Sequence, residues 1–205
     1  MQKHLVAEAE AGEITAANEA VKTQKLVQIA CGVAYDEEGK PIELDCKARI
    51  NELLECIEQS GGKAIVFVPL TGVLDMLKRE LGRKYKVEVV NGSVSLGERS
   101  RIFNEFQNGS EVEVLLAHPA TMAHGLTLTS AKAIIWYGPI TSNEQYTQAN
   151  ARTERIGKKH TTSVIHIAAT DLDRRMFERL KNKQKLQGFR RSDAAEPVQD
   201  RKSVV

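Results

Sequence analysis

The amino-acid sequence predicts an α/β fold in which a mainly parallel sheet is covered on both faces by helices. From Lys63 onward, short apolar runs typical of buried strands alternate with amphipathic helical patterns. The 205 residues are 41% apolar and 27% charged, which suits one globular domain with extensions. The unusual polar loops all follow strands, and open parallel sheets bind ligands at that edge. We therefore expect a functional site where the strands end.

The N-terminal segment is less regular than the rest. Residues 1–30 resemble one or two helices with an interruption near Gly12, although their apolar stripe is ragged. Residues 31–44 contain turn chemistry between two extended pieces and predict a hairpin. We therefore expect residues 1–46 to form a helical and hairpin extension.

The central domain is expected over residues 47–187 and begins with a helix at Lys47–Gln59, which Gly61 ends. Further helices are expected to start at Thr71, at Ser95 with its capping-box partner Glu98, and at Thr170. The five predicted strands are Ala64–Pro69, Val87–Val90, Val112–Ala117, Ala131–Gly138 and Ser163–Ala169. Residues 188–205 are polar and of mixed charge, and we expect a flexible tail there.

Charge and cysteine content exclude several classes of protein. The formal net charge is only +2, but acidic residues gather near the N-terminus and basic ones in the last helix, so a polyanion would contact the C-terminal half. The three cysteines, without CxxC or histidine at metal spacing, indicate reduced thiols and no metal site. No apolar run reaches the roughly 20 residues that span a bilayer, so we expect a cytoplasmic protein that does not enter a membrane.

The stretch QANARTERIG carries the strongest functional signal. A helix of roughly 14 residues is expected from a cap at Thr141 or Ser142 to Gly157, with Gln148, Arg152 and Arg155 at i, i+4 and i+7. Two guanidinium groups on one face suit an anion such as a polyphosphate, because each guanidinium group can bind two phosphate oxygens at once. The alternative is a solvated basic face.

Two further loops contain candidate contacts. The loop His118–Ala131 mixes small residues with hydroxyl groups, including Thr121, and keeps Gly125 where a backbone can approach a ligand. It can equally be an irregular crossover. Asn91, Gly92 and Ser93 follow the second strand and form either a simple turn or a nucleic-acid contact.

A complete nucleotide site is missing from the sequence. It contains neither GxxxxGK[ST] nor GxGxxG, and no strand ends in an acidic pair that could hold Mg²⁺. Arginines suited to a γ-phosphate therefore occur without a loop for the rest of the nucleotide, which is the composition of half a site.

These motifs together resemble a known family. The order of AIVFVP, VVNGS, the helix with Arg99 and Phe106, LLAHPATMAHGLTLTSA, IIWYGP and QANARTERIG resembles the second RecA-like lobe of superfamily 2 helicases. It is most similar to the Swi/Snf-like translocases of phages and prophages. The resemblance implies a three-layer RecA-like domain that closes on a first lobe, with ATP and Mg²⁺ held mainly by that first lobe.

The resemblance also implies roles for individual residues. Arg155 would be the arginine finger and Arg152 would reach the γ-phosphate, while Gln148 and Gly125 would lie at the nucleotide. The residues implied to touch the nucleic-acid backbone are Asn91, Gly92, Ser93, His118 and Thr121.

Three functions remain open from the sequence. The leading hypothesis is the C-terminal lobe of a nucleic-acid-dependent ATPase in a bacterial or phage-infected cell, which tracks along duplex DNA or unwinds it without sequence preference and is inactive without its N-terminal lobe. The second is a non-enzymatic module that keeps the fold and binds nucleic acid or protein through its basic last helix. An unrelated small-molecule enzyme is disfavoured because no general acid, base or nucleophile forms a recognisable constellation.

Overall fold

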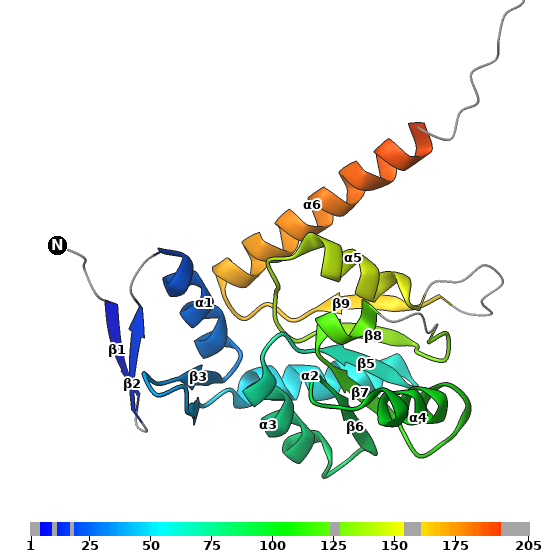
Figure 1. Cartoon of the computed structure of the whole chain (residues 1–205), viewed down its shortest axis with the longest axis horizontal. Coiled ribbons are helices and arrows are strands. Elements are labelled where there is room, and N and C mark those ends of the chain that lie inside the picture. Colours follow the sequence, from blue (N-terminus) through cyan, green and yellow to red (C-terminus); the bar gives the residue numbers. More distant parts are fainter. Residues whose placement is uncertain (1–4, 10–11, 17–18, 124–127, 154–160, 194–205) are drawn as a thin grey trace, which may run out of the picture.

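The computed structural model of the chain describes residues 5–9, 12–16, 19–123, 128–153 and 161–193. Figure 1 shows a central sheet with helices on both faces, a small N-terminal region beside it, and a long last helix that projects from the body. The elements are β1 (Leu5–Ala9), β2 (Gly12–Ala16), α1 (Glu19–Ala30), β3 (Val33–Tyr35), β4 (Pro41–Glu43), α2 (Lys47–Ser60), β5 (Ala64–Phe67), α3 (Thr71–Leu81), β6 (Val87–Val90), α4 (Leu96–Asn108), β7 (Val114–Ala117), the 3₁₀ helix η1 (Pro119–Ala123), β8 (Ala133–Trp136), α5 (Asn143–Ala151), β9 (Ser163–His166) and α6 (Asp171–Asp193).

The central sheet has five strands in the order β6-β7-β5-β8-β9, and all its neighbouring pairs are parallel. Each of the five predicted strands is present, which confirms the expected fold class. Because the strands run in the same direction, the loops that follow them meet at one edge of the sheet.

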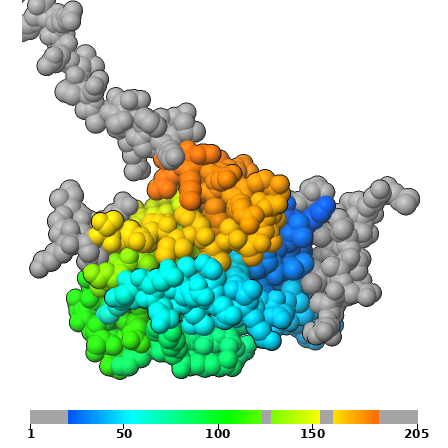
Figure 2. All heavy atoms as spheres, turned by 180° about the vertical axis from the view of Figure 1, so that it is seen from behind, coloured from blue at the N-terminus to red at the C-terminus, as the bar shows by residue number. Residues whose placement is uncertain are grey.

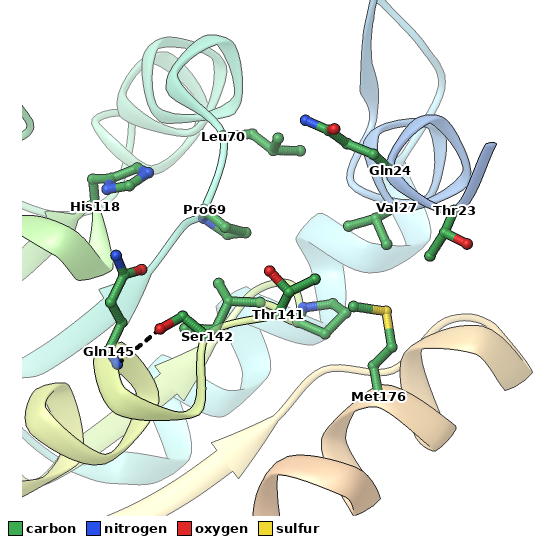
Figure 3. A pocket seen from close by; sticks show the side chains of 12 residues that line it. Thr23, Gln24, Val27, Pro69, Leu70, His118, Thr141, Ser142, Gln145 and Met176 are labelled. Atoms are coloured by element: carbon green, nitrogen blue, oxygen red, sulfur yellow. Dashed lines mark hydrogen bonds between the residues drawn. The ribbon is translucent and has the colours of Figure 1, made fainter. Parts of the chain in front are cut away.

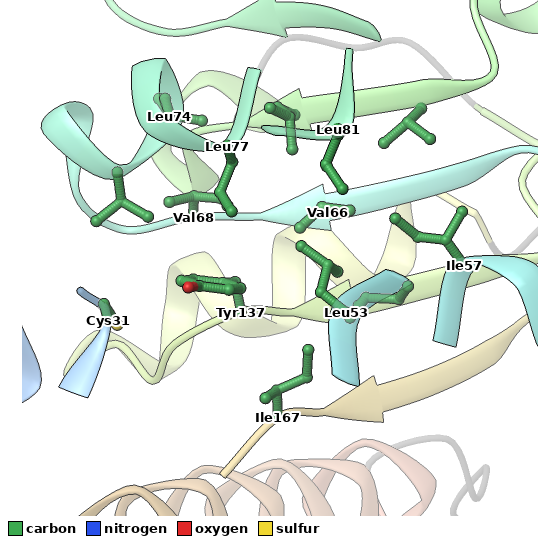
Figure 4. Close-up of a cluster of buried hydrophobic side chains, with 14 of the residues drawn as sticks. Cys31, Leu53, Ile57, Val66, Val68, Leu74, Leu77, Leu81, Tyr137 and Ile167 are labelled. Carbon is green, nitrogen blue, oxygen red and sulfur yellow. The ribbon is translucent and has the colours of Figure 1, made fainter. Parts of the chain in front are cut away.

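Alternate residues of the strands face two separate apolar cores. Ala64 and Val66 of β5 point to a core shared with α1, α2 and α3, part of which is drawn in Figure 4. Ile65 and Phe67 point to a second core shared with α4, α5 and α6. A strand buried on both faces is apolar throughout, which explains the continuous run AIVF. The domain therefore has three layers, as expected.

The N-terminal prediction is partly wrong. Residues 19–30 form a helix as expected, but β1 and β2 pair as an antiparallel hairpin where we predicted a helix. The two strands LVAEA and GEITA contain the β-branched residues Val6, Ile14 and Thr15, and neither strand is long enough to form a stable helix alone. The hairpin predicted over residues 31–44 is confirmed, since β3 pairs with β4.

Helix ends follow the predicted caps in some places only. The Ser95 hydroxyl accepts a hydrogen bond from the backbone N–H of Glu98, as expected. At α3 the capping position is Leu70 rather than Thr71, and no side chain caps the helix. The last helix continues through Gly188 to Asp193, past the point where we expected the tail to begin. No helix among the residues placed by the structure is both long and apolar enough to cross a membrane.

A buried arginine on α2 joins elements from both ends of the domain. Arg49 is only 5% exposed. Its guanidinium group donates to the carbonyl oxygens of Tyr137 (2.9 and 2.5 Å), Ile167 (2.8 Å) and Ala30 (3.0 Å). It also forms a 3.0 Å ion pair with the fully buried Asp173 of α6. In Figure 2, α2 (cyan) and α6 (orange) cover the same side of the molecule, although they come from opposite halves of the chain.

Asp173 has a second structural role at the start of α6. Its Oδ2 atom accepts hydrogen bonds from the backbone N–H groups of Ala169 (3.1 Å) and Thr170 (3.2 Å), in addition to the arginine contact. The Thr170 hydroxyl in turn accepts from the N–H of Asp173. The carboxylate therefore caps the helix and neutralises Arg49 at the same time.

Candidate functional site

A polar groove of about 490 Å³ lies at the edge where β5, β6 and β7 end. We use the name polar groove for the surface formed by Thr71, Asn91, Gly92, Ser93, Arg99, His118, Ala120 and Thr121. All five residues expected to touch nucleic acid are in this set, although they come from two loops that are distant in the sequence. The parallel sheet brings them together because β6 and β7 are neighbours.

The loop after β6 is held by its own side chains. Asn91 Oδ1 accepts from the backbone N–H of Ser93 at 3.0 Å and from the Ser93 hydroxyl at 2.7 Å. Arg99 Nη2 donates to the carbonyl oxygens of Asn91 (3.4 Å) and Val94 (3.2 Å). Arg99 Nε is buried and has no hydrogen-bond partner within the described ranges. A guanidinium group with a spare donor therefore lies behind an ordered turn.

The loop after β7 contributes a neutral imidazole. His118 Nδ1 accepts from the backbone N–H of Ala120 at 3.3 Å. Burial lowers the pKa of His118 below its usual 6.5, so the ring is uncharged at neutral pH. Thr121 is 6% exposed, and its hydroxyl donates to the His118 carbonyl oxygen at 2.6 Å. Its hydrogen is thus used within the loop, and Thr121 shapes the groove more than it offers a donor.

The helix expected to carry the arginines is shorter than predicted. Ser142 caps it, accepting from the N–H of Gln145, but α5 has nine residues and ends at Ala151. The reason lies in the next residues: the Thr153 hydroxyl donates to the Asn150 carbonyl oxygen at 3.1 Å, and the Arg152 carbonyl oxygen accepts from the N–H of Leu128 at 2.8 Å. These contacts satisfy the helix end without another helical turn.

Arg152 lies against the loop that follows β7. Its Nε atom donates to the Met122 carbonyl oxygen at 2.8 Å, and its side chain is half-buried. Gln148 is exposed, and its amide donates to Glu144 at 3.0 Å, within α5. Arg155 and Gly125 lie outside the described residues. Of the four residues predicted to lie at a nucleotide, Arg152 is the one that the structure connects to the 118–131 loop.

A row of aromatic side chains supports α5 from below. The rings of Phe67, Trp136 and Tyr146 follow one another with centroid separations of 4.8 and 4.9 Å. Trp136 Nε1 donates to Asn150 Oδ1 at 3.0 Å, and the Tyr146 hydroxyl lies 2.8 Å from His166 Nε2 on β9. The position of α5, and so of Arg152, is therefore set by the sheet beneath it.

The Tyr146–His166 contact predicts a pH dependence of stability. Burial, with a smaller contribution from Lys181, lowers the pKa of His166 to about 4, against about 6.5 in an unfolded chain. Between these values the unfolded chain binds the proton more tightly, so the free energy of unfolding should fall as the pH is lowered from about 6.5 to about 4. One proton limits this slope to about 1.4 kcal/mol per pH unit, and solvent screening of the partly buried ring makes it smaller.

His166→Gln tests this expectation because it keeps a polar partner for Tyr146 and removes the titrating ring. Chemical denaturation of both proteins across this pH range should give a shallower slope for the variant. Equal slopes would show that His166 is not the titrating group.

Two arginines have roles that the sequence pattern did not indicate. Arg99 was noted only as part of the helical motif, although it lines the polar groove beside the predicted contacts. Arg49 was not singled out, because a lone arginine in an amphipathic helix is usually solvated. Its one signal was its place on the same side of the helix as Leu53 and Ile57, both buried.

The described residues carry only part of the predicted nucleotide site, because Arg155 and Gly125 lie outside them. Arg152 can bind an anion, whereas no group of three His, Cys, Asp or Glu side chains among the described residues could hold a metal ion. The sequence contains no phosphate loop that could hold the rest of a nucleotide.

Comparisons with known proteins identify the family of the chain. Residues 48–157 match the family model described as the helicase conserved C-terminal domain. Protein p41 of Acyrthosiphon pisum secondary endosymbiont phage 1 is 29% identical over 194 residues, which are 91% of this chain and 40% of that protein. The DNA repair protein RAD5B of Arabidopsis thaliana is 30% identical over 146 residues, 68% of this chain and 11% of the relative.

The chromatin-remodeling ATPase INO80 of Saccharomyces cerevisiae is 25% identical over 141 residues, covering 68% of this chain and 10% of INO80. The chain thus spans less than half the length of each of these relatives.

Solved structures show the same fold. The C-terminal part of the Fun30 ATPase domain superposes with a TM-score of 0.58 at 20% identity, covering 63% of this chain and 44% of that one. The C-terminal domain of the DEAD-box protein Dbp5 gives 0.54 at 20% identity, covering 67% and 78%. With the family model matching more than half of its length, this chain belongs to the helicase C-terminal domain family, as a second RecA-like lobe of the superfamily 2, Swi/Snf-like type.

Proposed function

We propose that this chain supplies the second lobe of a DNA-dependent ATPase that tracks along duplex DNA or unwinds it. The observation that carries the proposal is the polar groove, where Ser93, Arg99 and His118 meet at the end of the sheet. Nucleic acid would lie along this groove, and ATP with Mg²⁺ would lie between this lobe and a first lobe that holds the phosphate loop. Closing and opening of the two lobes would move the contacts along the strand.

The chemistry of the groove suits a phosphate backbone. Arg99 brings a positive charge, the exposed Gly92 can offer its backbone N–H, and none of the described residues that line the groove is a carboxylate. Contacts to phosphate and sugar position a protein on nucleic acid without reading its sequence. Binding should therefore be insensitive to sequence and should weaken as salt is added.

The nucleotide half of the proposal depends on the arginines. Arg152 contacts the carbonyl oxygen of Met122, which is three residues before Gly125 in the sequence. Arg155 is three residues after Arg152. In this proposal Arg155 is the arginine finger, Arg152 reaches the γ-phosphate, and Gln148 and Gly125 lie near the nucleotide. The chain alone is then expected to bind nucleic acid without hydrolysing ATP.

Replacing Arg99 tests the groove. In fluorescence anisotropy with labelled duplex DNA, Arg99→Met should weaken binding equally for unrelated sequences. It should also reduce the slope of log affinity against log salt by about one unit or slightly less. Arg99→Lys keeps the charge and should keep most of that slope.

Arg83→Met is the matched control, because Arg83 is exposed in the turn after α3 and pairs with Glu80 outside the groove. If Arg83→Met and Arg99→Met lowered the affinity equally, or if the chain bound no nucleic acid at low salt, the proposed groove would be wrong.

A further inference from the structure

A second hollow adjoins the polar groove and shares His118 with it. This hollow, of about 480 Å³, lies where β5 and β8 end and is closed on its far side by α1 and α6. Figure 3 shows His118 and Gln145 on one side, Gln24 of α1 opposite, and Met176 of α6 at the base. Its volume is within the roughly 300–1,000 Å³ of small-molecule sites. Nucleic acid in the polar groove would therefore pass its entrance.

The lining of this hollow differs in charge from that of the polar groove. None of its twelve lining residues is an acid, lysine or arginine. Among the described lining residues, His118 is the one titratable side chain, and its lowered pKa keeps it neutral at pH 7. A phosphate would find no counter-charge here, and burying it without one is unfavourable. The occupant should therefore be uncharged.

The lining offers apolar walls together with amide and hydroxyl groups. Leu70, Ile140 and Met176 provide the apolar surface. Gln24 and Gln145 point their amides into the hollow, and neither side-chain amide has a hydrogen-bond partner in the part of the chain that the structure describes. An amide can both donate and accept, as the edge of a nucleobase does. This combination suits a flat molecule with apolar faces and a hydrogen-bonding edge.

The elements that line the hollow are packed against the rest of the domain, as a binding site requires. Val27 of α1 is 7% exposed, and the carbonyl oxygen of Ala30 at the end of α1 accepts from the buried Arg49. Ser142 and Gln145 are held at the first turn of α5 by their own hydrogen bond. The walls thus belong to the same packed body as the sheet.

We propose that this hollow is a base pocket, which receives one unpaired nucleobase of the strand whose backbone lies in the polar groove. The proposal rests on the proposed function, because the neighbouring groove must first bind the strand. In a duplex the base would have to leave its stack, which costs free energy. The base pocket therefore favours single-stranded over duplex segments. The phosphate contacts of the polar groove do not distinguish between the two.

The test compares strands with and without bases. Fluorescence anisotropy at low salt would use a labelled oligothymidylate, an abasic strand of the same length that keeps every sugar and phosphate, and a duplex. Apolar contact and a hydrogen bond to the base together should make the wild-type chain bind oligothymidylate about tenfold more tightly than the abasic strand. The duplex should bind like the abasic strand, when affinities are compared per phosphate.

Filling the pocket should abolish the preference. Thr141 is exposed at the rim, so Thr141→Phe can occupy the hollow without disturbing the core. This variant should bind oligothymidylate and the abasic strand equally, at the wild-type affinity for the abasic strand. Gln145→Leu should lose part of the preference. Thr161→Phe, at an exposed position before β9 and so at the opposite edge of the sheet, should behave as the wild type.

The possible results distinguish failure of the base pocket from failure of the proposed nucleic-acid binding in the polar groove. Equal wild-type binding of the two strands, or a preference that survives in Thr141→Phe, would overturn the base pocket and leave the backbone groove intact. Failure to bind either strand would overturn both. If free adenosine shifted the amide NMR signals of Thr141 and Gln145 while the strands showed no preference, the pocket would hold a free nucleoside and not a base of the strand.

Discussion

Arg49→Met is expected to lower the free energy of unfolding by about 3–5 kcal/mol, the cost of removing one member of a buried ion pair. The substitution would leave the fully buried carboxylate of Asp173 without its counter-charge. It would also remove the donor from the carbonyl oxygens of Tyr137, Ile167 and Ala30. Because domains are stable by only about 5–15 kcal/mol, urea denaturation followed by circular dichroism should show a large shift of the midpoint.

Arg79→Met is the control for this experiment. Arg79 also pairs with a carboxylate, Glu43, at 2.7 Å, but both side chains are 52% exposed. Such surface pairs contribute about 0–1 kcal/mol. A loss for Arg49→Met no larger than for Arg79→Met would contradict the role assigned to the buried pair.

A double variant guards against simple failure to fold. Arg49→Met with Asp173→Leu removes both charges, and replacing a buried pair with apolar groups is often close to neutral. The cap on α6 and the carbonyl partners would still be lost. We therefore expect the double variant to be more stable than Arg49→Met alone, and a less stable one would show that the ion pair is not the dominant interaction.

The proposed function makes Arg155 an arginine finger, so Arg155→Ala should lower ATP turnover by about 10³- to 10⁵-fold. The measurement needs this chain together with the protein or segment that carries the first lobe, since phosphoryl transfer also requires the phosphate loop and Mg²⁺. DNA binding by the variant should be unchanged, because the polar groove lies on other loops. This combination would distinguish loss of transition-state charge stabilisation from loss of the complex.

Arg179→Ala, at an exposed position of α6, is the matched control and should leave turnover unchanged. The 205-residue chain alone should show no ATPase activity above background. Robust turnover by the purified chain alone, abolished by Arg155→Ala, would contradict the two-lobe proposal.

The local sequence pattern predicted secondary structure correctly in some segments and incorrectly in others. Ile65 and Phe67 lie in a strand whose continuous apolar run has one stable outcome, burial between two layers of helices, so the five strands and the fold class could be predicted. Residues 5–16 have a weak pattern with no clear period, and the helix predicted there is a hairpin. The helix after Ser142 was predicted too long. No local signal in the sequence reveals that the backbone N–H of Leu128, from another loop, donates to the Arg152 carbonyl oxygen.

The amino-acid sequence was sufficient to predict the parallel sheet, the edge at which its loops meet, and the family, because strand and helix periodicity and motif order are local properties of the chain. The spatial relations came from packing. Parallel pairing of β6 with β7 brings Ser93 and His118 into one groove, and the contacts of Arg49 hold α1 and α6 together with the sheet beside a second hollow. Such contacts join residues that are far apart in the chain. Their partners are selected by side-chain geometry in three dimensions, and the periodicity of the sequence does not encode that geometry.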